Sequence, residues 1–176
     1  PHLGCFEITA QYVSTFGDIT VLYRPPRQAW IQNMILGGRQ RERLHLAPAD
    51  LTGVRSLIKA LKKGQAVGML PDQAPKVGEG VWLSFFGKPA YTMTLAARLT
   101  ETGATTLMAW GERLPNGRGY RLHFHPPRQA LSGTTVDRAQ QINFEVEALV
   151  RECPTQYLWG YNRYKQPSGA EAPPVG

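Results

Sequence analysis

A histidine and a glutamate near the amino end, in the pattern His2-x-x-x-x-Glu7, have the residue types of a general base and its partner. One loop or turn can bring two residues at this spacing together, and the carboxylate then accepts a hydrogen bond from one ring nitrogen. The other nitrogen can take a proton from a substrate hydroxyl. Because such pairs are more often incidental than catalytic, the pattern by itself indicates only a candidate base.

Two arginine-rich segments could bind an anionic substrate. Arg24 follows an apparent strand that ends in Tyr23, where a guanidinium could hold a phosphate with two hydrogen bonds. Arg39 begins the basic cluster at 39–43, which has the same potential. A solvated turn and a charged helix end, respectively, are the simpler interpretations of these two segments.

A third candidate is Asp72, which follows the apolar run 66–70 after one proline. This run reads as a buried strand fed by a helix, and in βαβ arrangements ligands bind at the carboxyl ends of the strands. Further along, a glycine-containing loop leads to Phe85 and Phe86. These two rings could line an acyl or headgroup pocket, or they could close the core beneath a loop. The loop's glycines match no phosphate-binding fingerprint.

The sequence argues against several other kinds of site. His123 and His125 share one face of an expected strand, but no third metal ligand lies near them in sequence. Cys5 and Cys153 are too far apart in sequence to suggest a zinc site or a disulfide framework. No Gly-x-Ser-x-Gly motif is present, which weakens the case for a serine hydrolase.

Composition bounds the class of protein and the charge of its partners. Hydrophobic residues make up 42% and charged residues 19% of the 176 residues, as in a globular domain. The net charge of +7 favours anionic partners, and composition does not choose among nucleic acid, anionic lipid headgroups, phosphorylated sugars and an acidic carrier protein. No run approaches the roughly 20 apolar residues of a membrane span, and no signal peptide opens the chain, so we expect a soluble piece.

Strand and helix patterns alternate along the chain, which predicts an α/β fold. The clearest helix covers 51–63, with Asp50 as its N-cap and Gly64 as its stop signal. The patterns predict further helices at 7–15, 26–35, 91–101 and 137–151, and strands at 19–23, 66–70, 105–110 and 120–124. The segment 167–176 has the composition of a disordered tail.

Several of these features occur in the order found in one known family, and the chain resembles the bacterial lipid A biosynthesis acyltransferases over residues 1 to about 167. The landmarks that carry the resemblance are His2-x-x-x-x-Glu7, Val21-Leu22-Tyr23-Arg24-Pro25, Gly68-Met69-Leu70-Pro71-Asp72-Gln73, Phe85-Phe86-Gly87-Lys88-Pro89-Ala90 with Thr92, and Pro154-Thr155-Gln156-Tyr157-Leu158-Trp159 with Arg163-Tyr164-Lys165.

The resemblance implies a role for each matching residue. His2 would deprotonate the acceptor hydroxyl, and Glu7 would orient it and stabilise its charged form. Arg24 would lie near the active site on a lipid A phosphate, and Asp72 would have a structural or substrate-positioning role. Arg39 is a looser match to a substrate-binding arginine. No cofactor and no metal are implied.

The resemblance also implies a fold and partners. We expect a mixed, largely parallel central sheet flanked by helices, similar to that of glycerolipid acyltransferases, with residues 1–166 as the catalytic domain. The acyl donor would be an acyl carrier protein, and the acceptor a lipid A precursor of the Kdo-lipid IVA type. The family is held by an amino-terminal hydrophobic segment on the cytoplasmic face of the bacterial inner membrane, an anionic surface.

Three alternatives remain open from the sequence. An acyltransferase of the same broad fold could act on another glycolipid or on a glycerolipid, although that motif usually has Asp in the place of Glu7. A thioesterase would use similar residues and release free fatty acid. A non-catalytic basic module could bind anionic membranes or nucleic acid, but the aromatic residues do not interleave with the densest arginine cluster, so we expect no nucleic-acid partner.

Overall fold

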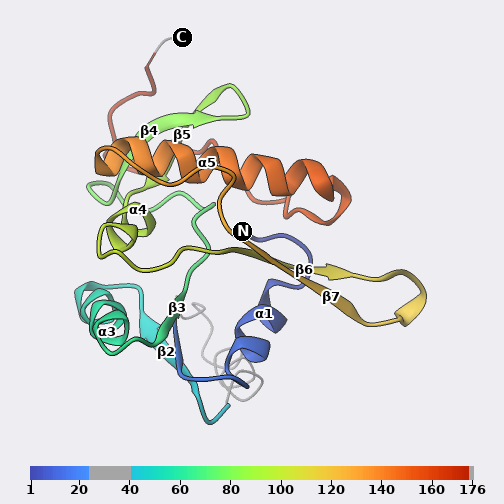
Figure 1. Cartoon of the computed structure of the whole chain (residues 1–176). Coiled ribbons are helices and arrows are strands. Elements are labelled where there is room, and N and C mark those ends of the chain that lie inside the picture. The colour runs from blue at the N-terminus through green and yellow to red at the C-terminus, as the bar shows by residue number, and fades with distance from the viewer. Residues whose placement is uncertain (24–40, 175–176) are drawn as a thin grey trace. The chain divides into compact units, whose positions relative to one another are not determined.

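The computed structural model describes residues 1–23 and 41–174 (Figure 1). These residues form two compact units, and each is described by itself. The three-stranded unit is Glu7–Met69, and the two-hairpin unit joins Pro1–Phe6 to Leu70–Gly176. The helix expected at 26–35 lies outside the described residues.

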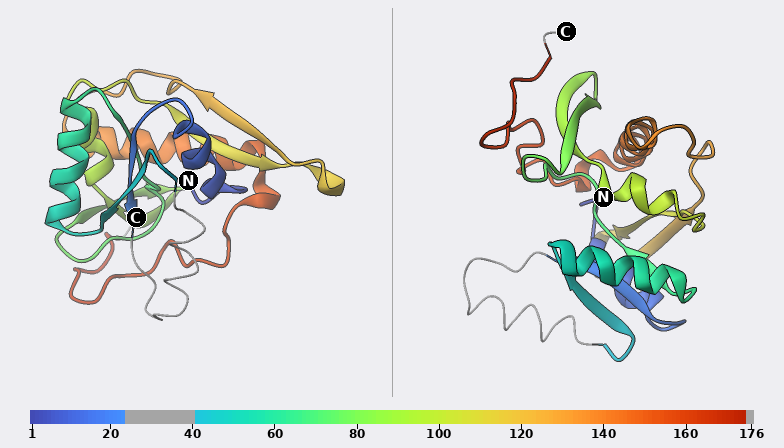
Figure 2. Two further views of the ribbon diagram at one scale, coloured as in Figure 1. Left: turned by 90° about the horizontal axis from the view of Figure 1, so that it is seen from below. Right: turned by 90° about the vertical axis from the view of Figure 1, so that its left-hand side faces the viewer.

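The three-stranded unit is built around a parallel sheet of order β2-β1-β3. Its elements along the chain are α1 (Phe6–Val13), β1 (Ile19–Tyr23), β2 (Leu44–Pro48), α3 (Leu51–Lys62) and β3 (Ala66–Gly68). Ile19 in the central strand lies opposite Leu44 on one side and Ala66 on the other. Helix α3 connects β2 to β3 and packs against the sheet, as the βαβ pattern predicts (Figure 2).

Local signals determine where α3 begins and ends. The Asp50 side chain accepts hydrogen bonds from the backbone N–H groups of Thr52 and Gly53, at 2.8 and 3.0 Å. At the other end Gly64 has φ +71°, a conformation that glycine adopts without steric cost. The expected helix is therefore confirmed almost to the residue.

The two-hairpin unit contains two antiparallel strand pairs and the longest helix described. Its elements are β4 (Gly80–Phe85), β5 (Lys88–Met93), α4 (Leu95–Thr100), β6 (Met108–Arg113), β7 (Tyr120–His125) and α5 (Thr135–Glu152), with short 3₁₀ turns at Pro115–Gly117 and Pro154–Gln156. Strand β4 pairs with β5, and β6 pairs with β7. Helix α5 packs along β4 and against α4 (Figure 1). Its start is held by a capping box between Thr134 and Asp137.

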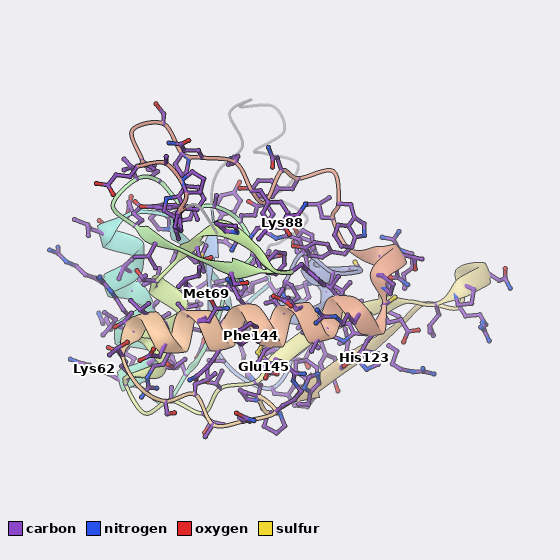
Figure 3. All side chains as sticks on the ribbon, turned by 90° about the horizontal axis from the view of Figure 1, so that it is seen from above. Lys62, Met69, Lys88, His123, Phe144 and Glu145 are labelled. Carbon is purple, nitrogen blue, oxygen red and sulfur yellow. The ribbon has the colours of Figure 1, made fainter. Side chains whose placement is uncertain are left out.

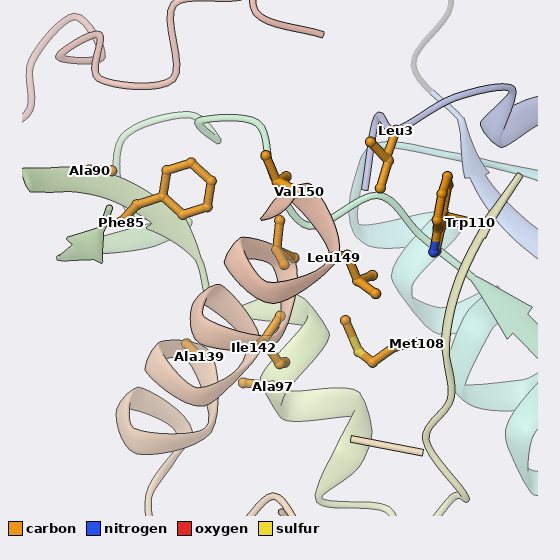
Figure 4. Close-up of a cluster of buried hydrophobic side chains, with 11 residues drawn as sticks. Leu3, Phe85, Ala90, Ala97, Met108, Trp110, Ala139, Ile142, Leu149 and Val150 are labelled. Carbon is orange, nitrogen blue, oxygen red and sulfur yellow. The ribbon is translucent and has the colours of Figure 1, made fainter. Parts of the chain in front are cut away.

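A hydrophobic core joins α5 to both hairpins and to the amino end of the chain (Figure 4). Phe85 contributes from the end of β4, Val146 from α5 and Trp110 from β6. Leu3 is fully buried in the same cluster. Burying a side chain of this size stabilises a fold by about 1.5–3 kcal/mol. The residues next to His2 are therefore part of the core.

A buried polar network crosses this core around Arg163. Its guanidinium donates from Nη1 to the carbonyl oxygen of Tyr91 and from Nη2 to Oγ1 of Thr92, both at 2.8 Å. Asn143 of α5 donates to the same Thr92 oxygen at 3.1 Å and to the carbonyl oxygen of Ser84 at 2.9 Å. The network therefore ties the C-terminal segment to β5, β4 and α5.

We expect Arg163→Met to lower the free energy of unfolding by about 2–4 kcal/mol, because it removes the two short hydrogen bonds that the guanidinium donates inside the core. Arg98→Met, on the exposed side of α4, is the matched control and should change stability by less than about 0.5 kcal/mol. Urea unfolding of both variants checks this. Equal losses in the two would mean that the network contributes nothing specific.

The structure confirms the α/β class and corrects two expectations. Among the strands described, parallel ladders are confined to the three strands of one unit, and the other strands form antiparallel hairpins. The helix expected at 91–101 is wrong in its first turn, where Tyr91 and Thr92 belong to β5 and pair with Trp82 and Val81. Aromatic and β-branched residues favour such pairing, which here overrides the helical pattern.

Candidate functional site

The backbone around His2 is held by two segments of the two-hairpin unit. The carbonyl oxygen of His2 accepts a hydrogen bond from the Leu158 N–H at 3.1 Å, and Gly4 donates to Gln156 at 2.9 Å. Cys5 donates to the carbonyl oxygen of Gly111 in β6 at 2.7 Å. Gly4 has φ +59°, and a Cβ there would lie 2.0 Å from the Gly111 carbonyl oxygen, so only glycine fits.

The imidazole of His2 is paired with the carboxylate of Asp72. Nδ1 of the ring lies 2.8 Å from Oδ1, and the backbone N–H of His2 donates to Oδ2 at 2.8 Å. Because an ionised carboxylate can only accept, Nδ1 carries the proton of the neutral ring, and Nε2 is the basic nitrogen. The Phe6 ring packs edge-on against the imidazole at 4.8 Å. Together these contacts fix the orientation of the ring.

The pair is placed so that the base is accessible and the carboxylate is not. The side chain of His2 is 14% exposed and that of Asp72 only 1%. Burial by itself raises the pKa of Asp72, but the hydrogen bonds from the His2 ring and the His2 backbone N–H, together with the charge of a protonated His2, hold it well below its usual range. Asp72 is therefore ionised at neutral pH, as a partner for an imidazolium must be.

Two further polar side chains surround Asp72. Burial first, and then the negative charge of Asp72, raises the pKa of Tyr157, so its phenol stays protonated. Burial lowers the pKa of Arg163, and the charge of Asp72 opposes that shift. The loop after Asp72 is anchored by the Tyr161 hydroxyl, which accepts from the Ala74 N–H at 2.9 Å. The carboxylate thus lies in a rigid, partly polar setting.

We expect Asp72→Asn to make stability less dependent on acid. The pKa of Asp72 in the folded state lies below its value of about 3.9 in an unfolded chain. Its stabilising contribution is therefore complete above about pH 5 and is lost as the pH falls through 4 towards the folded pKa. The parent should lose on the order of 2 kcal/mol more than the variant over this range. Urea unfolding at several pH values measures the difference.

Asp18→Asn provides the control for this measurement. Asp18 also pairs with a histidine, His45, at 2.8 Å, but both side chains are largely exposed. Solvent screens such a pair, so this variant should follow the parent's acid dependence closely. Parallel stability curves for the parent and Asp72→Asn would show that the buried carboxylate is not ionised as we infer.

The other residues selected from the sequence have different outcomes. Glu7 is the second residue of α1, in the three-stranded unit, and its partnership with His2 stays a prediction. Arg24 and Arg39 lie outside the described residues. Phe85 is buried in the core, which is one of the two interpretations that the sequence left open, and Phe86 is only partly buried.

Sequence reasoning did not find the contact between His2 and Asp72. The two residues are 70 positions apart, and nothing in their spacing indicates a pair. The available signal was the position of Asp72 just beyond β3, which marked the loop as interesting without naming its partner. Nothing in the sequence indicated that Tyr157 interacts with Asp72, although this tyrosine belongs to one of the family landmarks.

Within residues 1–23 and 41–174 the structure shows neither a cluster of metal ligands nor a helix that could span a membrane. No group of three or more His, Cys, Asp or Glu side chains there could hold a metal ion. His123 instead lies 3.0 Å from Glu112 and stacks on the Trp110 ring at 4.4 Å. Of the helices in this part of the chain, none has the length and hydropathy needed to cross a bilayer.

Comparison with known proteins finds one family over almost the whole chain. Residues 1–166 match the family model described as bacterial lipid A biosynthesis acyltransferase. The lipid A biosynthesis palmitoleoyltransferase of Escherichia coli (strain K12) is 27% identical over 93% of this chain and 54% of its own length. The lauroyltransferase of the same organism is 31% identical over 84% of the chain and 49% of its own length.

A third relative is more distant. The lipid A biosynthesis acyltransferase of Haemophilus influenzae is 24% identical over 90% of the chain and 50% of its own length. The chain thus spans about half the length of the curated relatives it matches. The family model nevertheless covers residues 1–166, which include every landmark of the resemblance from His2 to Lys165. The chain belongs to the bacterial lipid A biosynthesis acyltransferase family.

Proposed function

We propose that this protein transfers a fatty acyl chain from an acyl carrier protein to a hydroxyl of a lipid A precursor of the Kdo-lipid IVA type. Family membership supports the acyl transfer and the class of acceptor. The observation that carries the mechanism is the pair of a partly exposed His2 and a buried, ionised Asp72. The net charge of +7 suits a phosphorylated acceptor, an acidic carrier protein and an anionic membrane surface.

In the proposed reaction Nε2 of His2 takes the proton of the acceptor hydroxyl. The oxygen attacks the thioester carbonyl, an ester C–O bond forms, and the C–S bond breaks. The carrier thiolate leaves and recovers the proton from the imidazolium. Asp72 stabilises the imidazolium and keeps the tautomer that leaves Nε2 basic. Glu7, from the family motif, is the second candidate for this supporting role.

The remaining parts of the proposal come from the family resemblance. Arg24 would contact a phosphate of the acceptor, and Arg39 is a weaker candidate for the same function. Phe86 is the better placed of the two phenylalanines to line an acyl pocket, because Phe85 is fully in the core. We also propose a glycerolipid-acyltransferase-like arrangement for the catalytic domain 1–166, followed by the tail 167–176. The reaction would occur at the cytoplasmic face of the bacterial inner membrane.

The test is an acyl-transfer assay with the purified protein, a labelled acyl carrier protein and the lipid A precursor. We expect label to move to the lipid and to require the acceptor. Label appearing mainly as free fatty acid, with or without acceptor, would favour a thioesterase. Transfer to a glycerolipid but not to the lipid A precursor would show that the acceptor is wrong while the chemistry is right.

A further inference from the structure

Exposed aromatic and aliphatic side chains gather beside the turn between β4 and β5. Trp159 is 59% exposed and Leu158 44% exposed. The Trp159 ring lies 6.3 Å from that of Phe86 and 4.9 Å from that of Tyr157. We call the exposed Leu158 and Trp159, together with the partly buried Phe86 and Tyr157, the aromatic patch. Single exposed hydrophobic residues are ordinary in proteins, whereas contiguous ones mark interaction surfaces.

The turn that presents Phe86 is strained. Phe86 has φ +49°, a left-handed conformation that is unusual for a bulky side chain and that glycine would adopt freely. Its backbone N–H donates to Oε1 of the buried Glu147 at 2.7 Å, which holds the turn in place. Strained residues that the fold holds in this way are concentrated at functional sites. The strain therefore marks Phe86 as a candidate functional position.

Positive charges border the aromatic patch. The Arg151 guanidinium lies 4.7 Å from the Phe86 ring centroid and pairs with Oε2 of Glu147 at 3.0 Å, and its side chain is 61% exposed. Lys88, on the β4–β5 hairpin (Figure 3), has its Nζ 6.0 Å from the ring of Tyr164. The Tyr164 hydroxyl in turn donates to the carbonyl oxygen of Phe85 at 3.0 Å. We call Arg151 and Lys88 the basic rim.

The aromatic patch adjoins the candidate base. The Leu158 N–H donates to the carbonyl oxygen of His2, and Tyr157 forms a β-bridge with Leu3. The side chains of Leu158 and Trp159 are thus exposed on the segment that supports His2. Whatever binds the aromatic patch is brought within a few residues of the proposed catalytic centre.

We propose that the aromatic patch and the basic rim dock the protein on an anionic lipid bilayer. Tryptophan and tyrosine suit the headgroup region, where one part of the ring system is apolar and the other polar, and lysine and arginine are attracted to anionic headgroups. An acidic protein would be held mainly by charge, whereas the most exposed side chains of the aromatic patch are an indole and a leucine. The catalytic benefit of this docking rests on the proposed function, but the docking itself does not.

The test measures binding to vesicles of phosphatidylcholine with and without phosphatidylglycerol, with no acyl donor or acceptor present. We expect cosedimentation that needs phosphatidylglycerol and weakens with salt. Leu158→Ser/Trp159→Ser should reduce the partition coefficient about tenfold or more, because two apolar side chains no longer enter the interface. An inactive enzyme would leave this measurement fully interpretable, so the two proposals fail separately.

Matched controls come from the same unit. Leu107→Ser/Tyr120→Ser removes a leucine that is 54% exposed and an aromatic residue that is 45% exposed outside the aromatic patch, and it should bind as the parent does.

Arg151→Gln/Lys88→Gln should weaken binding more than Arg98→Gln/Arg118→Gln, and this comparison does not depend on how the serine variant folds. Equal vesicle binding by all these variants, or no binding by the parent, would overturn the proposal. Loss of acyl carrier protein binding with unchanged vesicle binding would assign the aromatic patch to a protein partner instead.

Discussion

His2→Ala is expected to lower kcat for acyl transfer by about 10²–10⁴-fold, the range that a positioned general base contributes. The physical reason is that alanine leaves the acceptor hydroxyl with no group to take its proton. KM for the acceptor should change little, because the imidazole assists proton transfer in the transition state more than it contributes to substrate binding. Initial rates over a range of acceptor concentrations separate the two parameters.

His45→Ala is the matched control for this variant. His45 also forms a histidine–aspartate pair at 2.8 Å, with Asp18, but its side chain is 51% exposed and it lies on β2. It should keep parental activity. Circular dichroism and urea unfolding show whether His2→Ala remains folded. A folded His2→Ala protein with parental kcat would rule out the proposed base.

Asp72→Asn is expected to lower kcat by at least about 10²-fold, again with little change in KM. The amide keeps the shape of the side chain but removes the negative charge that stabilises the imidazolium. Its NH₂ group can also donate to Nδ1, which would move the ring proton to Nε2 and abolish its basicity. The pH dependence of kcat/KM distinguishes this role from a purely structural one, since loss of the carboxylate charge should shift the profile.

Glu7→Gln, measured in the same assay, decides which carboxylate supports the base. If Asp72 alone does so, Glu7→Gln should retain most of the activity. If Glu7 is instead the carboxylate that supports His2, Glu7→Gln should lower kcat more than Asp72→Asn does. Asp18→Asn, in the exposed pair, should be neutral in either case. A neutral Asp72→Asn with an unchanged pH profile would remove Asp72 from the mechanism.

Much of the fold was predictable because its signals are local. The cap at Asp50 and the positive φ at Gly64 delimit α3 from nearby residues alone. The strand at Ile19–Tyr23 follows from a compact apolar and β-branched run. The β4–β5 hairpin was not predicted, because its turn carries phenylalanine at a left-handed position where glycine or asparagine is the usual signal. The pairing of β4 with β5 and the hydrogen bond from the Phe86 N–H to the buried Glu147 stabilise that turn.

The sequence by itself determined the family, the candidate base His2 and the basic character of the protein, because motif order and charge are properties of the chain. Only the tertiary structure showed that Asp72 pairs with His2 and that the Trp159 ring lies beside that of Phe86. These contacts join residues about 70 positions apart. No helical or strand period encodes such a distance, and the contacts arise when the burial of Leu3, Phe85 and α5 in one core brings their neighbours together.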